Sequence, residues 1–157
     1  MSDSDEPVIS KFMEDPGAVF AADKSVADTI EAIREMVKTR FVTYAYVTDA
    51  ADHLIGVVAM RDLLLARKEQ TLGEIMLKNP FSLRSNMQLK EAMKGMVNKH
   101  FPCYPVTDGG RLVGLVWGAK LFEAQAVEIT AQAGKMVGVE KEERFSTPLR
   151  KSFFFRH

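Results

Sequence analysis

The sequence is poor in the residue types that most often carry covalent or metal chemistry. It has one cysteine, Cys103, in 157 residues, so an internal disulfide is excluded and a reducing compartment fits. Cys103 lies in an apolar run with no adjacent Lys or Arg, which indicates a core thiol. The three histidines, His53, His100 and His157, are scattered and match no catalytic or metal-binding spacing. We therefore expect a protein that is not an enzyme.

Net charge and long apolar runs are also absent. The 21 basic and 21 acidic residues cancel, so no overall field favours a nucleic-acid partner. No run approaches the ~18 apolar residues of a membrane span, and the polar, acidic start is unlike a signal peptide. The acids concentrate in the first 23 residues, whereas the last 14 carry four basic residues and no acid. We expect a soluble chain with a disordered acidic leader over residues 1–11.

The chain contains an internal repeat. Residues 45–65 and 104–122 each read as an apolar strand, a turn that opens with Asp, a second apolar run entered through Gly56 or Gly114, and a helix. The period of roughly 60 residues is longer than that of common solenoids. We therefore expect an α/β (α+β) fold in which two similar units pack by pseudo-twofold symmetry. Ligands tend to bind in clefts at such a seam.

Hydrophobic spacing and turn residues predict the elements of each unit. Ser25 is a good N-cap for a helix that begins at Val26, and the Gly109-Gly110 pair favours a tight turn with positive φ. The expected helices cover residues 26–37, 60–67, 71–77, 87–99 and 119–136, and the expected strands cover 42–48, 53–59, 81–83, 103–107 and 112–117.

The repeated unit, with Gly56-Val57-Val58-Ala59-Met60-Arg61-Asp62 in its first copy, resembles the CBS domain. The two copies resemble a tandem CBS pair, with domain 1 at residues 12–70 and domain 2 at 71–136 running into a long connecting helix. The resemblance implies that an adenine nucleotide (ATP, ADP or AMP) binds at the seam. It also implies that the Asp of this motif, Asp62, takes the ribose hydroxyls.

The residues of the motif suit such a ligand in part. The carboxylate of Asp62 can accept hydrogen bonds from both hydroxyls of a cis-diol, and Arg61 beside it can pair with phosphate oxygens. Ala59 stands where the family has Ser or Thr. In the second copy, Trp117 and Lys120 replace the hydroxyl and the carboxylate. We therefore expect one nucleotide per chain, with the second site closed or filled by the Trp117 ring.

Aromatic side chains near the motif can stack on adenine. Tyr44 and Tyr46 lie on the preceding strand, and Phe101 lies at the matching approach in the second copy. Each of these rings is alternatively a core residue. The nucleotide-binding residues that we predict are Asp62, Arg61, Tyr44, Ala59, Tyr46, Phe101 and Val58.

The C-terminal end is similar to a second, narrower group. The long helix followed by AGKMVGVEKEERFSTPLRKSFFFRH resembles the junction between the cytosolic and membrane parts of MgtE-type magnesium transporters, and Arg61 to Leu65 resembles their CBS pair. The resemblance implies that residues 137–157 are a juxtamembrane segment that leads to a transmembrane pore domain. The chain would then lie at the cytoplasmic face of the cell membrane. Basic residues and Phe fit such a position.

This resemblance implies a regulatory CBS pair that gates magnesium or divalent cation transport in response to an adenine nucleotide and Mg²⁺. Carboxylates are the ligands that Mg²⁺ prefers, and Glu123 and Glu128 on the connecting helix are the candidates, although they also suit a solvated helix face. A homodimer is implied as well. The alternative is a free-standing CBS-pair sensor of adenine nucleotides that regulates a soluble partner.

Overall fold

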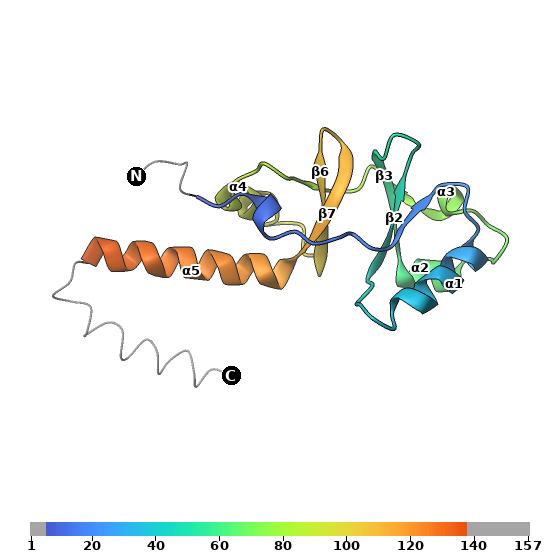
Figure 1. Ribbon diagram of the computed structural model, residues 1–157, viewed down its shortest axis with the longest axis horizontal. Helices are drawn as coiled ribbons and strands as arrows, with labels where there is room; N and C mark the ends of the chain where they lie inside the picture. Colours follow the sequence, from blue (N-terminus) through green and yellow to red (C-terminus); the bar gives the residue numbers. More distant parts are fainter. Residues whose placement is uncertain (1–5, 138–157) are drawn as a thin grey trace. The chain divides into compact units, whose positions relative to one another are not determined.

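The computed structural model describes residues 6–137 of the chain (Figure 1), with side chains described up to residue 134. Residues up to Leu121 belong to one compact unit, and α5 (Gly118–Val137) continues from there into a second unit. The first unit contains both repeats. Each repeat has its own sheet, and Figure 1 shows the two sheets facing one another at the centre of this unit.

The first repeat is built on a four-stranded sheet in the order β1-β2-β3-β4. β1 pairs with β2 in parallel, and the other two pairs are antiparallel. The strands are β1 (Val19–Ala21), β2 (Tyr44–Thr48), β3 (Leu54–Ala59) and β4 (Leu77–Lys78), and the helices are α1 (Val26–Met36), α2 (Met60–Leu65) and α3 (Leu72–Ile75).

Helix α1 shows how local sequence sets these elements. The Ser25 side chain accepts a hydrogen bond from the Asp28 N–H at 3.1 Å, as predicted for the N-cap. The buried residues Val26, Thr29 and Ile33 recur at helical spacing and face the sheet. The helix thereby covers the outer face of the first sheet.

The second repeat has a three-stranded sheet in the order β5-β6-β7, with β5 (Leu83–Arg84), β6 (Cys103–Asp108), β7 (Arg111–Trp117) and the helix α4 (Leu89–Gly95). The Gly109-Gly110 turn joins β6 to β7 with φ values of +59° and +85°, which confirms the predicted turn. The fold is therefore the mixed α/β pair of similar units that the repeat predicts.

The leader differs from the disordered segment that we expected over residues 1–11. Residues 9–11 form a 3₁₀ turn, and Ile9 is fully buried. The Ile9 N–H donates to the Met87 carbonyl at 2.8 Å, and Glu6 accepts a hydrogen bond from the Lys90 N–H at 2.8 Å. One apolar side chain and these hydrogen bonds thus fix residues 6–11 on the second repeat. Residues 1–5 lie outside the described residues.

The first sheet continues past the expected domain boundary at residues 70 and 71. β4 follows that boundary, yet it pairs with β3 of the first sheet. β1 and β4 have three and two residues, which is too short for an alternating pattern to predict. The predicted juxtamembrane segment, apart from Val137, lies outside the described residues. Within residues 6–137, no helix has both the length and the apolar character needed to cross a membrane.

Backbone and side-chain contacts join the two repeats. The Leu54 N–H donates to the Gly110 carbonyl at 3.0 Å, and the Leu112 N–H donates to the Asp52 carbonyl at 2.9 Å. The hairpin turns of the two sheets therefore pair with each other. A cluster of buried side chains, Tyr46, Cys103 and Leu115, fills the space between the sheets.

Candidate functional site

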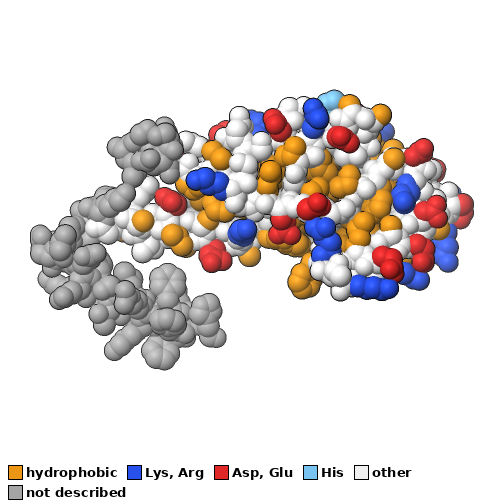
Figure 2. Space-filling model, in the orientation of Figure 1, with side chains coloured by type: hydrophobic (Ala, Val, Ile, Leu, Met, Phe, Trp, Pro, Cys, Tyr) orange, Lys and Arg blue, Asp and Glu red, His pale blue; other side chains and the backbone are white. Residues whose placement is uncertain are grey.

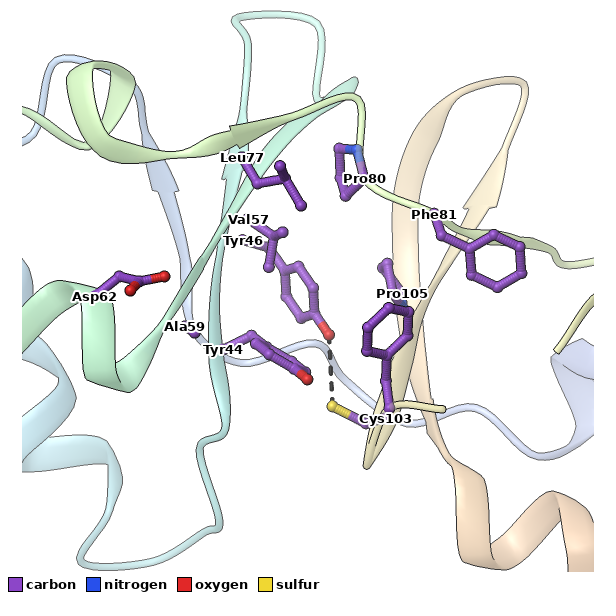
Figure 3. Close-up of a pocket in the computed structure, with 11 residues that line it drawn as sticks. Tyr44, Tyr46, Val57, Ala59, Asp62, Leu77, Pro80, Phe81, Cys103 and Pro105 are labelled. Atoms are coloured by element: carbon purple, nitrogen blue, oxygen red, sulfur yellow. Dashed lines mark hydrogen bonds between the residues drawn. The ribbon is translucent and has the colours of Figure 1, made fainter. Parts of the chain in front are cut away.

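A cleft opens between the two sheets and holds about 570 Å³ of space, part of it open to solvent. Figure 3 shows side chains of both repeats pointing into this space, and Figure 2 shows hydrophobic side chains gathered in the middle of one face, where the sheets meet. The first repeat contributes Tyr44, Tyr46, Val57, Ala59 and Asp62, the connection contributes Leu77, Pro80 and Phe81, and the second repeat contributes Phe101, Cys103 and Pro105.

The wall from the first repeat follows from strand periodicity. Tyr44 lies opposite Ala59 and Tyr46 lies opposite Val57 in the β2–β3 ladder. Because side chains alternate along a strand, these four share the face toward the cleft. Val58 has the opposite direction: it is buried in the core cluster of the first repeat. The prediction that Val58 lines the site is therefore wrong, because the pleat of β3 turns this side chain away from the cleft.

Asp62 supplies a carboxylate at one end of the cleft. It lies in the first turn of α2, its side chain is 52% exposed, and it points toward the cleft in Figure 3. The Arg61 Nε lies 3.6 Å from the Asp62 Oδ1, and the Arg61 side chain is 84% exposed. Arg61 is not part of the lining and lies beside Asp62.

The wall from the second repeat depends on a buried tyrosine. The Tyr104 hydroxyl donates a hydrogen bond to the Lys99 carbonyl and accepts one from the Phe101 N–H at 3.1 Å. The Tyr104 ring meets the rings of Phe81 and Phe101 edge-on, with centroids 5.9 and 5.7 Å apart. These contacts hold the loop before β6 in place and bring Phe101 to the cleft.

The deep part of the cleft is polar but uncharged. The Tyr46 hydroxyl and the Cys103 thiol form a hydrogen bond of 3.5 Å across the seam. Burial raises the pKa of the Tyr46 hydroxyl and of the Cys103 thiol, and partial burial raises the pKa of Tyr44. All three groups therefore stay protonated at neutral pH. Asp62 is then the charged side chain in the lining.

Of the eleven lining residues, the sequence predicted five: Tyr44, Tyr46, Ala59, Asp62 and Phe101. It did not predict the other six: Val57, Leu77, Pro80, Phe81, Cys103 and Pro105. It treated Cys103 as a core thiol, and the structure shows a residue that is both buried and part of the cleft. The internal repeat gives a signal that Cys103 also faces the cleft. Cys103 and Pro105 occupy the positions in the second sheet that Tyr44 and Tyr46 occupy in the first.

The equivalent position in the second repeat is filled. Trp117 lies opposite Cys103 in its ladder, as Ala59 lies opposite Tyr44. The Trp117 ring packs against the inter-sheet cluster, and its Nε1–H donates to the Glu14 Oε1 at 3.1 Å. Lys120 is exposed. That the Trp117 ring takes the place of a second ligand stays a prediction.

The two candidate magnesium ligands lie on α5, in the second compact unit. Glu123 and Glu128 are five positions apart, a rotation of about 140° around a helix, so they point in different directions. Within the described part of the chain, no group of three or more His, Cys, Asp or Glu side chains is placed to hold a metal ion. Magnesium binding by Glu123 and Glu128 therefore stays a prediction.

The profile of the CBS domain matches residues 10–69 and 72–116. The chain therefore belongs to the CBS domain family and carries two copies of the domain. Among curated proteins, it is 31% identical over 100 residues to the magnesium transporter MgtE of Thermus thermophilus, a match that covers 63% of this chain and 22% of the transporter. It is also 28% identical over 109 residues to inosine-5'-monophosphate dehydrogenase of Nitrosopumilus maritimus, covering 68% and 22% of the two chains. The chain thus spans about a quarter or less of these relatives.

Two solved structures resemble the fold and contain adenine nucleotides. The cytosolic domain of the Mg²⁺ channel MgtE in complex with ATP has a TM-score of 0.67 and 26% identity, and the match covers 72% of this chain and 46% of that one. CBSX2 in complex with AMP has a TM-score of 0.63 and 25% identity, and the match covers 78% of this chain and 98% of that one.

Proposed function

We propose that the chain is a regulatory CBS pair that binds an adenine nucleotide in the cleft between its two repeats. The observation that carries this proposal is the convergence of the Asp62 carboxylate and the Tyr44 ring on one cleft with an apolar lining. Asp62 is exposed enough to accept hydrogen bonds from a ribose diol. The relatives solved with ATP and AMP support the choice of an adenine nucleotide.

The lining of the cleft suits a ligand with a flat apolar end and a charged end. The base fits between the aromatic and apolar side chains of the two walls, where Ala59 leaves room beside Tyr44. The ribose lies at Asp62. The phosphate lies toward the exposed edge of the cleft, where Arg61 is one candidate partner, since a phosphate buried among protonated phenols and a carboxylate would be strongly disfavoured.

Because both repeats line the cleft, a bound nucleotide contacts both of them. Asp62 and Tyr44 lie on the first repeat, and Phe101 and Pro105 lie on the second. A ligand with this position favours one packing of the repeats over others. It shifts their equilibrium only by the difference between its affinities for the two arrangements. This shift is the signal that the pair passes to another domain.

We propose further that the signal gates transport of magnesium or another divalent cation through a transmembrane pore domain, at the cytoplasmic face of a membrane. The similarity to MgtE supports this proposal. The second candidate is a free-standing sensor that regulates a soluble partner, and CBSX2 favours it because the match covers 98% of that chain. Sequencing the open reading frame distinguishes the two candidate functions. Apolar spans encoded after residue 157 would support the transporter, and a stop codon there would support the sensor.

The first test is thermal unfolding with AMP, ADP and ATP, each with and without Mg²⁺. A ligand at ~100 times its Kd stabilises a protein by about 2.7 kcal/mol, which raises the midpoint of a chain of this size by roughly 5–10 °C. Asp62→Ala should remove the nucleotide shift. Asp28→Ala is the matched control, because Asp28 is also a first-turn carboxylate of a helix and lies outside the cleft.

An unchanged midpoint with all three nucleotides would contradict nucleotide binding, and a shift that survives Asp62→Ala would contradict the assignment of the site. Magnesium binding by Glu123 and Glu128 stays a prediction. A shift with Mg²⁺ alone that Glu123→Gln removes would support it. Absence of any shift up to millimolar Mg²⁺ would count against it.

A further inference from the structure

The loop before β6 brings a basic side chain to the ring of one lining residue, Phe81. Lys99 is exposed, and its Nζ lies 5.7 Å from the centroid of the Phe81 ring, which lines the cleft. The backbone of this loop is held on both sides of residue 100, because the Tyr104 hydroxyl bonds the Lys99 carbonyl and the Phe101 N–H. The backbone position of Lys99 is therefore fixed, and its exposed side chain extends from this loop.

The lining itself offers no cation. Among the residues that line the cleft, none is Lys, Arg or His, and Asp62 is an acid. A charged phosphate gains little from such a surface and has a large desolvation cost there. Any preference of the cleft for a nucleotide over a nucleoside must then come from cations at the rim.

Two cations lie next to side chains of the lining, one on each repeat. Arg61 lies beside the Asp62 carboxylate at 3.6 Å, so part of its charge is already balanced. Lys99 contacts the ring of Phe81, and within the described residues its ammonium has no carboxylate within 4 Å. A phosphate competes more readily with a neutral ring than with a carboxylate for a cation. Lys99 is therefore the better placed of the two to accept a phosphate group.

We infer that Lys99 of the second repeat binds the phosphate of the ligand and makes the cleft select a nucleotide over the corresponding nucleoside. This inference rests on the proposed function, because it needs the base and ribose in the cleft. It adds that the phosphate contact comes from the repeat that does not carry Asp62. The ligand then contacts the first repeat through its ribose and the second repeat through its phosphate.

The test is calorimetric titration of the chain with adenosine, AMP and ATP in low-salt buffer. Lys99→Gln should weaken AMP and ATP by about two- to fivefold, the size expected of one exposed charge pair, and leave adenosine unchanged. The loss should shrink at ~0.5 M salt because the contact is exposed. Lys90→Gln is the control, since Lys90 is an exposed lysine of the same repeat outside the lining.

The outcomes separate this inference from the proposed function. Equal loss of adenosine and ATP in Lys99→Gln, or no loss of either, would overturn the role of Lys99 and leave the nucleotide site standing. The same is true if wild type binds adenosine as tightly as ATP. If none of the three ligands binds wild type, both proposals fail.

Discussion

Tyr46 of the first repeat and Cys103 of the second share a buried hydrogen bond, with 3.5 Å between the hydroxyl oxygen and the sulfur. Both residues also line the cleft. One polar contact therefore belongs both to the seam that joins the repeats and to the floor of the candidate site. A ligand that shifts this floor changes the packing of the seam, which links binding to the arrangement of the repeats.

A double-mutant cycle measures this contact. Tyr46→Phe and Cys103→Ala should each lower the free energy of unfolding by about 1 kcal/mol, since each removes one partner of a buried hydrogen bond. The double variant should lose less than the sum of the two, because the second change has no bond left to break. Tyr44→Phe is the control, because Tyr44 lies on the same face of β2 and no such bond joins it to Cys103. Strict additivity in denaturant titrations would mean that the bond contributes nothing.

The same pair predicts how stability depends on pH. Burial raises the pKa of Cys103 in the folded chain, so the folded state holds the thiol proton more tightly than the unfolded state does. This contribution is complete below the unfolded thiol pKa of about 8.5 and is lost as pH rises toward the folded pKa. Wild type should therefore lose stability relative to Cys103→Ala above about pH 8.5. Parallel stability curves of the two proteins from pH 7 to 10 would contradict this expectation.

Two adjacent valines test the assignment of faces on β3. Val58 is in the core of the first repeat, and Val57 lines the cleft. Val58→Ala should cost about 2 kcal/mol of stability through the cavity it leaves and leave nucleotide affinity nearly unchanged. Val57→Ala should cost less stability and weaken the nucleotide severalfold. Unfolding and titration of both variants decide the point, and a reversed pattern would mean that the register of β3 is wrong.

The repeat, the main strands and the wall from the first repeat were predictable because they depend on local patterns. Alternation on β2 and β3 places Tyr44 and Tyr46 on one face, and the motif marks Asp62. The second wall was not predictable in this way, since Phe81 and Phe101 reach the cleft through contacts with Tyr104. The leader was misjudged because its acidic composition hides one buried residue, Ile9. Such contacts join residues far apart in sequence and leave no periodic signal.

The exposed leucines of α2 predict a contact with a second copy of the chain. Leu64 and Leu65 are 72% and 78% exposed, and adjacent exposed leucines are typical of an interaction surface. If the chain forms the expected homodimer through this helix, Leu65→Glu should shift it toward the monomer without lowering its unfolding midpoint by more than a few degrees. Light scattering after size exclusion measures the mass. A monomeric wild type, or an unaffected dimer in the variant, would place no dimer contact at this helix.

Trp117 and Lys120 of the second repeat allow a direct comparison with Ala59 and Asp62 of the first. Trp117 occupies the place of Ala59, and its indole N–H is held by Glu14. Replacing Trp117 by Ala removes the ring, and Lys120→Asp restores a carboxylate at the position that matches Asp62. The double variant should therefore bind two nucleotides per chain by calorimetry, where wild type should bind one. Trp117→Ala alone should open the space without the ribose contact and leave the stoichiometry at one. A double variant that still binds one nucleotide, while remaining folded by circular dichroism, would show that the two repeats differ in more than these two side chains.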